Sequence, residues 1–277
     1  MTTTITLLVD NQAQQGLTHE HGLSIFIEHH GQRILFDNGQ NKALFMNAAK
    51  LNISLHDLDI IILSHGHYDH GGNLAALLEA NPNALFYAHP DCKNTRYSLH
   101  PNHPIKKISL SKAAIAAIET MPSAQCRLIT SATEVLPHLW LTGKIPRLCG
   151  IEDTGGPFYL DKKGTKIDWL NDDMSLWIET EAGLNIICGC CHAGIINTLN
   201  HIKKLTGESK PINTLLGGLH LINANQQRLN NTLEYLIKQN ISKLYPAHCT
   251  GAEPMALLKD TFKNKVEIAQ AGLTITL

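Results

Sequence analysis

The chain begins with short segments in which apolar and polar residues alternate. Alternation over roughly four to eight residues predicts β-strands, and we expect strands at Ile5–Val9, Leu23–Glu28 and Arg33–Phe36. The last two are separated by His29-His30-Gly31-Gln32, which is typical of a hairpin turn. The first forty residues are therefore predicted to form antiparallel β-sheet.

After residue 40, apolar residues recur at helical spacing in some segments and form continuous runs in others. Helical spacing predicts helices at Asn41–Leu51 and Asn73–Ala80, and apolar runs predict strands at Ile60–Leu63 and Ala84–Ala88. The second half repeats this order. Its expected elements are the strands Ser175–Glu179, Leu184–Cys188, Ile212–Leu216, Lys243–Tyr245 and Gly272–Leu277, and the helices Ile195–Leu205, Gln226–Gln239 and Ala252–Lys259.

Two segments share one layout, in which a buried strand is followed by a polar turn bearing a histidine, a glycine and a helix start. These are residues 59–74, with His70, and residues 183–196, with His192. The repetition predicts an α/β fold of two βα halves, a four-layer αβ/βα sandwich with the polar turns along one sheet edge. No clear linker is present, so residues 1–277 are expected to form a single domain.

Two irregular segments, Pro90–Pro104 and Gly143–Asp173, are expected to be long loops. Loops of this length in a compact domain are usually functional, so we expect them to determine substrate specificity.

Composition excludes several classes of protein. Hydrophobic residues make up 43% and charged residues 17%, which suits a packed core. The net charge of −1 argues against electrostatic binding to nucleic acid or membranes. No apolar run approaches the roughly 20 residues that cross a bilayer, and the first residues lack a secretory signal. We therefore expect a cytoplasmic protein.

Cysteine and histidine are the residues that suggest chemistry. The chain has seven cysteines, and Cys188, Cys190 and Cys191 lie within four positions, which disfavours a disulfide framework and indicates a reducing compartment. It also has 16 histidines, and histidine is the commonest metal ligand.

Four ligand-type side chains fall within His65-Gly66-His67-Tyr68-Asp69-His70, directly after a predicted strand. In a turn, His65 and His67 can converge on one ion, while Asp69 and His70 can reach a second. A solvated surface loop is the alternative, but this spacing is far more specific than a lone histidine pair.

Residues Leu63–Gly72 are similar to the metal-binding signature of the metallo-β-lactamase superfamily, and Phe36–Gly39 resembles its first motif, whose Asp supports the metal site. The chain also resembles the proteins named for 7,8-dihydropterin-6-methyl-4-(β-D-ribofuranosyl)aminobenzene-5′-phosphate synthase, a likeness that spans nearly the whole chain. The segments that carry it are Val9–Asn11, the histidine motif, Gly189–Ile195, Gly217–Leu221 and Pro246–Gly251.

The resemblance implies a metallo-β-lactamase fold and two divalent metal ions. One ion would be held by His65, His67 and His192, and the other by Asp69, His70 and His248. Ligand chemistry favours zinc, with manganese or iron as alternatives.

The superfamily usually supplies a bridging Asp from a strand in its second half, but here that strand ends in Cys188-Gly189-Cys190-Cys191. A thiolate as replacement, a bridge by hydroxide alone, and cysteines that only fill space all remain open.

Two further positions are candidates for substrate contact. His220 follows Gly217-Gly218 and is expected either to contact a phosphate or leaving group or to be a buried structural residue. Asp10-Asn11 is expected to form a strand-end turn, with Asn11 lining the pocket as the alternative. His89 is placed outside the ligand set. The histidines expected at the surface are His19, His21, His29, His30, His100, His103 and His201.

These features predict a metal-dependent hydrolase that uses a metal-bound hydroxide on a small ester, phosphoester or lactone. Asp69 would be a ligand, orient the water and accept its proton. The expected partner is a small molecule, with a phosphate-bearing one suggested by the resemblance; the sequence does not specify the oligomeric state.

Two alternatives belong to other classes. A transferase would condense a dihydropterin with an aminobenzene ribose phosphate. Its phosphate would require basic side chains, for which Lys93, Arg96, Lys106, Lys107 and Arg147 are candidates, unless these are solvated loop charges. A metal-binding redox or thiol sensor protein would instead use Cys190 and Cys191.

Overall fold

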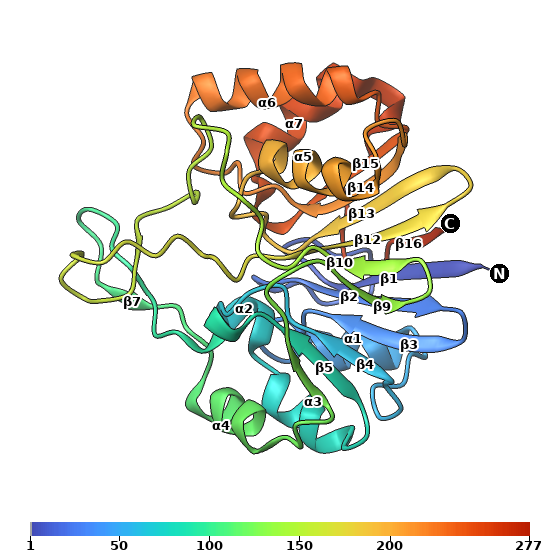
Figure 1. Ribbon diagram of the computed structural model, residues 1–277, viewed down its shortest axis with the longest axis vertical. Coiled ribbons are helices and arrows are strands. Elements are labelled where there is room, and N and C mark those ends of the chain that lie inside the picture. Colours follow the sequence, from blue (N-terminus) through green and yellow to red (C-terminus); the bar gives the residue numbers. More distant parts are fainter. Residues whose placement is uncertain (1) are drawn as a thin grey trace. The chain divides into compact units, whose positions relative to one another are not determined.

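The computed structural model describes residues 2–277, which form two compact units (Figure 1). Unit 1 comprises the chain up to Arg96, Lys107–Ile129 and Gln270–Leu277. Unit 2 comprises Tyr97–Lys106 and Thr130–Ala269. Each unit combines a β-sheet with helices packed on it, as expected for an α/β fold.

Unit 1 contains a seven-stranded sheet in the order β16-β1-β2-β3-β4-β5-β8. Its strands are β1 (Thr3–Val9), β2 (Ser24–His29), β3 (Gln32–Phe36), β4 (Ile60–Ile62), β5 (Leu85–Ala88), β8 (Cys126–Leu128) and β16 (Thr274–Thr276). Its helices are α1 (Ala43–Lys50), α2 (Tyr68–Gly71), α3 (Leu74–Ala80), η1 (Pro90–Lys93) and α4 (Lys112–Thr120). Strands β16 to β3 pair antiparallel, and β3, β4, β5 and β8 pair parallel.

The core of unit 1 lies between its sheet and helices α1, α3 and α4. Leu35, Ile61 and Phe86 are in register on β3, β4 and β5 and are fully buried in one cluster with apolar residues of these helices. Burying a side chain of this size stabilises the fold by about 1.5 to 3 kcal/mol. The carboxyl ends of β3 and β4 are thereby held firmly, and these are the ends from which the candidate ligands emerge.

Unit 2 contains a six-stranded sheet in the order β15-β14-β13-β12-β10-β9 and takes part in a small sheet in the order β11-β6-β7. Its strands are β6 (Tyr97–Ser98), β7 (Lys106–Lys107, which ends in unit 1), β9 (Thr133–Leu136), β10 (Leu139–Leu141), β11 (Phe158–Tyr159), β12 (Ser175–Thr180), β13 (Gly183–Cys188), β14 (Ile212–Gly218) and β15 (Lys243–Ala247). Its helices are α5 (Ile195–Thr206), α6 (Gln226–Gln239), η2 (His248–Thr250), α7 (Ala252–Phe262) and η3 (Lys263–Lys265). Apolar residues of β13, β14, α5, α6 and α7 form its core.

All the strands and helices predicted from hydrophobic period are present, with ends shifted by a few residues. The predicted loops Pro90–Pro104 and Gly143–Asp173 also contain two-residue strands, which are too short to produce a periodic signal. Helix α4 was not predicted, although its Ala-rich sequence and the Ser111 hydroxyl that accepts from Ala114 N are helix-start signals. The single domain expected for residues 1–277 stays a prediction. No helix formed by residues 2–277 is long and apolar enough to span a bilayer.

Candidate metal centre

Asp37 occupies a tightly held turn at the end of β3. Its φ of 59° is left-handed, a conformation that non-glycine residues seldom adopt. The backbone N–H of Asp37 donates to Ile62 O at 2.8 Å, and its carbonyl accepts from the Ser24 hydroxyl at 2.9 Å. Neighbouring strands on both sides therefore fix the position of a fully buried carboxylate.

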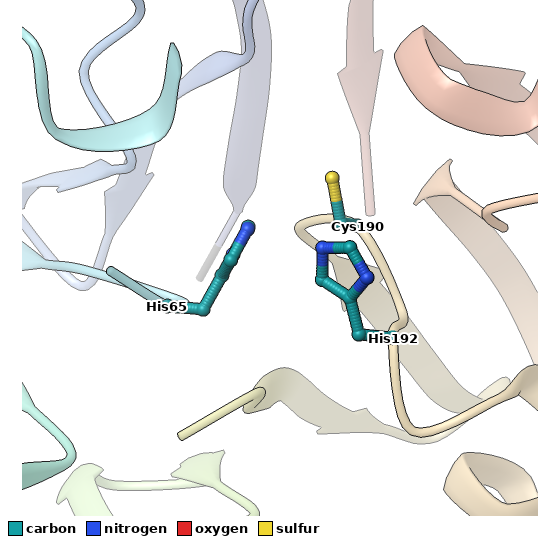
Figure 2. Close-up of side chains that lie close together, drawn as sticks. All are labelled: His65, Cys190 and His192. Carbon is teal, nitrogen blue, oxygen red and sulfur yellow. The ribbon is translucent and has the colours of Figure 1, made fainter. Parts of the chain in front are cut away.

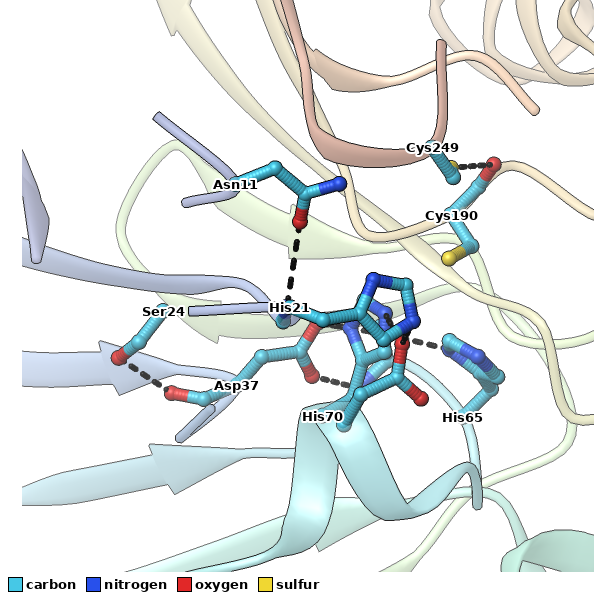
Figure 3. A network of polar contacts seen from close by, with 11 residues as sticks. Asn11, His21, Ser24, Asp37, His65, His70, Cys190 and Cys249 are labelled. Carbon is cyan, nitrogen blue, oxygen red and sulfur yellow. Dashed lines mark hydrogen bonds and ion pairs between the residues drawn. The ribbon is translucent and has the colours of Figure 1, made fainter. Parts of the chain in front are cut away.

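The Asp37 carboxylate orients two imidazoles (Figure 3). Its Oδ1 accepts from Ser64 N at 2.7 Å, and its Oδ2 accepts from both Ser64 Oγ and His70 Nδ1 at 2.7 Å. The only hydroxyl proton of Ser64 is used in this way, so its Oγ can only accept from His65 Nδ1, 2.9 Å away. Both His65 and His70 therefore carry a proton on Nδ1 and a lone pair on Nε2, the tautomer that ligates a metal.

The turn from His65 to His70 brings three imidazoles close together. The His65 ring centroid lies 4.5 Å from that of His67 and 4.3 Å from that of His70. His67 is extended, with φ −86° and ψ 150°, and directly precedes α2. All three residues and Asp69 are buried. Unit 1 thus gathers the four motif residues predicted to be metal ligands.

Gly66 allows this turn to pack against the segment after β5. A Cβ at Gly66 would lie 2.0 Å from the Cys92 carbonyl oxygen and 2.8 Å from Arg96 Nη1. Both distances are far inside van der Waals contact, so no side chain fits between the first two histidines of the motif. The need for glycine is steric at this position.

His21, which was expected to be an ordinary surface residue, is a neighbour of the motif. Its side chain is 55% exposed, yet its Nε2 lies 3.1 Å from Asp69 Oδ2. The next residues also approach Asp69, since Leu23 N donates to Asp69 O at 3.3 Å. His70 Nε2 is 3.8 Å from the same Asp69 oxygen. No local spacing signals the proximity of His21, which depends on the packing of a loop.

Asp10 and Asn11 form a turn at the end of a strand, as expected from the sequence. Asp10 Oδ2 accepts from Gln12 N at 3.0 Å, and Asn11 Oδ1 accepts from Gly22 N at 3.3 Å. Asn11 therefore supports the loop that carries His21. Its role as a substrate contact stays a prediction.

In unit 2, Cys190 and His192 project from the turn that follows β13 (Figure 2). The Nδ1 of His192 lies 2.8 Å from the Thr154 carbonyl oxygen. Because a carbonyl oxygen only accepts, Nδ1 must carry the proton and Nε2 the lone pair. His192 therefore has the same ligand-type tautomer as His65 and His70.

Buried polar groups hold the His192 turn in place. Arg147 donates to the His192 carbonyl oxygen, and Asp173 Oδ2 accepts from Ala193 N at 2.8 Å. Burial raises the pKa of Asp173 to about 7, although the Ala193 N–H and the Arg147 guanidinium oppose this change. Burial also lowers the pKa of Arg147.

Glu152 binds the amino terminus of α5, directly after the turn. Its two carboxylate oxygens accept from Ile196 N at 3.0 Å and Asn197 N at 2.9 Å, which satisfies two N–H groups at the helix start. Burial raises the pKa of Glu152, and these two N–H donors counteract part of the increase. A Cβ at Gly194 would lie 2.2 Å from the Glu152 carboxyl carbon, so this approach requires glycine.

His220 and His248 follow the next two strands, β14 and β15. Both have left-handed backbones, with φ of 45° and 47°, and both are buried. The His220 ring centroid lies 4.2 Å from that of His192, and the Phe158 ring packs against both in T-shaped arrangements, with centroid distances of 5.4 Å to His192 and 6.1 Å to His220. Uncommon backbone conformations of this kind cost about 1 to 3 kcal/mol each and gather at functional sites.

The cysteines of unit 2 differ in environment. A hydrogen bond with Cys188 and burial raise the pKa of the Cys191 thiol well above its usual range. The Cys249 thiol lies 3.4 Å from the Cys190 carbonyl oxygen (Figure 3). Burial raises the pKa of Cys249, but contact with Cys190 and the nearby imidazoles outweigh it, so the pKa lies well below its usual value.

The basic residues proposed for phosphate binding mostly contact protein groups. Arg96 is fully buried and donates to Asp91 O at 2.9 Å, so the alternative of a solvated loop charge is wrong for it. Lys93 lies 3.5 Å from Glu119, and Arg147 binds the His192 carbonyl.

Among the other histidines, one expectation of surface exposure is wrong. His29 is buried on β2, and its Nδ1 lies 2.8 Å from Thr3 Oγ1, because inward-facing positions of an inner strand are covered on that side. His89 accepts from Asp91 N at 3.1 Å and so caps η1.

Two curated proteins of Methanocaldococcus jannaschii are similar to the chain over most of its length. It is 31% identical over 266 residues to 7,8-dihydropterin-6-methyl-4-(beta-D-ribofuranosyl)-aminobenzene-5′-phosphate synthase, covering 92% of this chain and 90% of that protein. It is 34% identical over 259 residues to an uncharacterized protein, covering 92% and 93%.

Solved structures show the same fold. Tm1679, described as a metal-dependent hydrolase of the beta-lactamase superfamily, matches with a TM-score of 0.81 and 25% identity, covering 99% of this chain and 98% of that one. Zn²⁺-bound PqqB from Methylobacterium extorquens matches with a TM-score of 0.60 and 14% identity, covering 99% and 100%, which shows likeness of fold alone. The predicted α/β sandwich class is confirmed by these neighbours. Residues 17–137 also match the family description "Metallo-beta-lactamase superfamily", and the chain belongs to that superfamily.

Proposed function

We propose that this protein is a metal-dependent hydrolase of a small ester, phosphoester or lactone. Membership of the superfamily supports metal-dependent hydrolysis in general. The observation that carries the proposal is the orientation of His65, His70 and His192. Each imidazole donates its Nδ1–H to a fixed acceptor and so presents Nε2 as a ligand atom.

The donor set fits a divalent metal. Unit 1 offers three imidazoles and the Asp69 carboxylate in one buried turn, a combination that suits zinc and also accommodates manganese or iron. The hydrogen bond from His70 to Asp37 strengthens the imidazole as a ligand. Unit 2 offers His192 and His248. Two ions, with zinc preferred, are our proposal, and the division of ligands between them stays a prediction.

The ions, when bound, would supply Lewis acidity, which polarises a carbonyl or phosphoryl oxygen and acidifies water. The chain's own contribution is positioning. Asp69 Oδ2 is our candidate acceptor for the proton of the attacking water, and His21 Nε2 at 3.1 Å holds that carboxylate in place. In unit 2, the Phe158 ring packs against the rings of His192 and His220, both of which are buried from water.

A transferase is the second candidate, because one 31% identical relative bears the name of a synthase. Such a reaction would need groups that bind the ribose phosphate. Lys93, Arg96 and Arg147 already contact protein groups, and the candidates with exposed side chains are Lys106 and Lys107. We therefore place hydrolysis first. The high pKa of Cys191 favours a packing role for that thiol over a sensor role.

The test compares both reactions with one preparation of the full chain. Chromogenic phosphoesters, esters and lactones are screened with the purified protein, with chelator-treated protein and after zinc is restored. Hydrolysis that is lost with chelator, returns with zinc and is absent in His67→Ala supports the proposal. His56→Ala, an exposed histidine outside the motif, is the matched control. Condensation of a dihydropterin with an aminobenzene ribose phosphate, without hydrolysis, would overturn it.

A further inference from the structure

Three neighbouring parallel strands of unit 2 end in residues with soft or imidazole ligand atoms. Cys190 follows β13, His220 follows β14 and Cys249 follows β15. These strands pair parallel, with Cys188 opposite Gly217 and Gly218 opposite Ala247. Since parallel strands present their carboxyl ends at the same sheet edge, the residues after them converge.

The three side chains are close and buried. One ligand atom of each of Cys190, His220 and Cys249 lies within 4.8 Å of the other two, and their exposed fractions are 2%, 8% and 6%. Zinc binds sulfur at about 2.3 Å and nitrogen at about 2.0 Å, so two ligands of one ion lie at most roughly 4.6 Å apart. Small side-chain movements would bring the three atoms onto one ion.

Gly218 makes the approach of these turns feasible. A Cβ there would lie 2.5 Å from Cys249 Sγ and 3.3 Å from Cys190 Cα. Any larger residue would separate the two cysteine turns. The glycine pair at 217 and 218, singled out from the sequence for close approach, therefore brings two thiols together.

His220 shows that the cluster is more than packed thiols. Its Nδ1 is buried and has no hydrogen-bond partner of good geometry among residues 2–277, while the imidazole lies beside the Cys249 thiol. Leaving such a group unsatisfied costs about 1 to 3 kcal/mol. Its left-handed backbone adds a further cost. A ligand that binds Nδ1 would offset these costs, whereas apolar packing of the two thiols would require neither feature.

We propose that Cys190, His220 and Cys249 form a thiolate-rich metal site within unit 2. Two thiolates and one imidazole suit a thiophilic ion such as zinc, cobalt(II) or cadmium. Three protein ligands leave the fourth tetrahedral position open, so the site exchanges its ion or accepts an additional ligand more readily than a closed four-ligand site. The site uses none of the histidine-motif residues, but it shares Cys190 with the turn of His192, since one ligand atom of each of these two residues also lies within 4.8 Å of the other. Its test is therefore read from metal binding and not from hydrolysis.

The experiment uses cadmium as the probe. The full chain is stripped of metal under reducing conditions and titrated with Cd²⁺ while the ultraviolet thiolate-to-cadmium charge-transfer band is recorded. The wild-type protein should develop this band in proportion to the ion bound. Cys249→Ser removes one of the two thiolates and should lose roughly half of the intensity. His220→Asn should weaken Cd²⁺ binding, and Asn is chosen because it tolerates a left-handed backbone.

Matched variants separate this site from the histidine motif. Cys149→Ser removes a partly buried thiol of unit 2 outside the cluster and should keep the full band. His67→Ala should keep it as well, even if it abolishes hydrolysis. A full band in Cys249→Ser, loss of the band in His67→Ala, or no band in the wild-type protein would overturn the proposal.

A second measurement does not depend on how the variants fold. In the wild-type protein, bound Cd²⁺ should slow alkylation of Cys190 and Cys249 relative to Cys126, as mapped by peptide mass spectrometry. Equal alkylation rates with and without the ion would contradict the site.

Discussion

The buried Asp37 carboxylate accepts the Nδ1–H of His70 at 2.7 Å, with neither side chain exposed to solvent. The same oxygen accepts a hydrogen bond from the Ser64 hydroxyl, and the Ser64 oxygen accepts one from His65 Nδ1–H. One carboxylate thus sets the tautomer of two imidazoles. Its location at a strand end explains why ligand orientation depends on the sheet of unit 1 and not only on the motif itself.

Asp37→Asn should weaken metal binding without removing a ligand. The carboxylate accepts three hydrogen bonds, whereas an amide has one acceptor atom and would turn its NH₂ toward a donor. Loss of such a supporting contact typically lowers metal affinity about 10- to 100-fold. Competition with a chelating dye measures the metal affinity of the variant and of the wild-type protein. Asp57→Asn, at a 60% exposed aspartate, is the control and should bind like wild type.

Gly66→Ala should destabilise the protein even without metal. The new Cβ would lie 2.0 Å from the Cys92 carbonyl oxygen, so backbone must move. Overpacking of this kind costs about 1 to 3 kcal/mol of unfolding free energy. Urea unfolding of metal-stripped protein measures the change. Gly150→Ala, where a Cβ meets nothing within 4 Å, should stay within about 0.5 kcal/mol of wild type, and an equal loss in both would refute the steric explanation.

The site could be predicted from the sequence where its residues are contiguous. Ile60–Leu63 identified the buried strand, and the motif after it contains four candidate ligands that the structure gathers in one turn. The contact of His21 with Asp69 could not be predicted, because it depends on how a loop packs and has no period. Burial of Arg96 was missed for a similar reason, since an arginine in an irregular segment ordinarily remains solvated.

Glu152→Gln should change how stability depends on pH. Burial raises the folded pKa of Glu152 above its unfolded value of 4.5. Between these two pKa values the unfolded chain binds fewer protons than the folded one, so the Glu152 contribution to stability falls as pH rises. Urea unfolding measures the free energy of unfolding from about pH 4 to pH 7. Over this range the free energy of unfolding of Glu152→Gln should decline less, or rise more, than that of the wild-type protein. Glu234→Gln, at an exposed glutamate of α6, should follow the wild-type curve.

His21→Ala should slow hydrolysis while metal content stays the same, if the proposed function holds. His21 contacts Asp69 at 3.1 Å but is 55% exposed, and exposed ion pairs contribute only about 0.2 to 1 kcal/mol. The expected reduction in kcat is therefore about 1.4- to five-fold. KM should change little, because His21 positions a carboxylate and no substrate contact is assigned to it. His19→Ala is the control, and loss of metal in His21→Ala would show that His21 is itself a ligand.

Gly194→Ala should destabilise unit 2 more than its backbone angle alone explains. Gly194 and Gly207 flank α5 with nearly equal φ of 94° and 90°, so alanine is strained at both. Only at Gly194 would the Cβ meet another group, the Glu152 carboxyl carbon at 2.2 Å, whereas nothing lies within 4 Å at Gly207. The backbone strain of alanine at a positive φ is therefore similar in the two variants and cancels when their free energies of unfolding are compared.

Gly194→Ala should therefore lose about 1 to 3 kcal/mol more unfolding free energy than Gly207→Ala. Urea unfolding of the two metal-stripped variants measures this difference. It isolates the contact between Glu152 and the glycine that ends the His192 turn. Equal losses in the two variants would mean that Glu152 moves aside without cost.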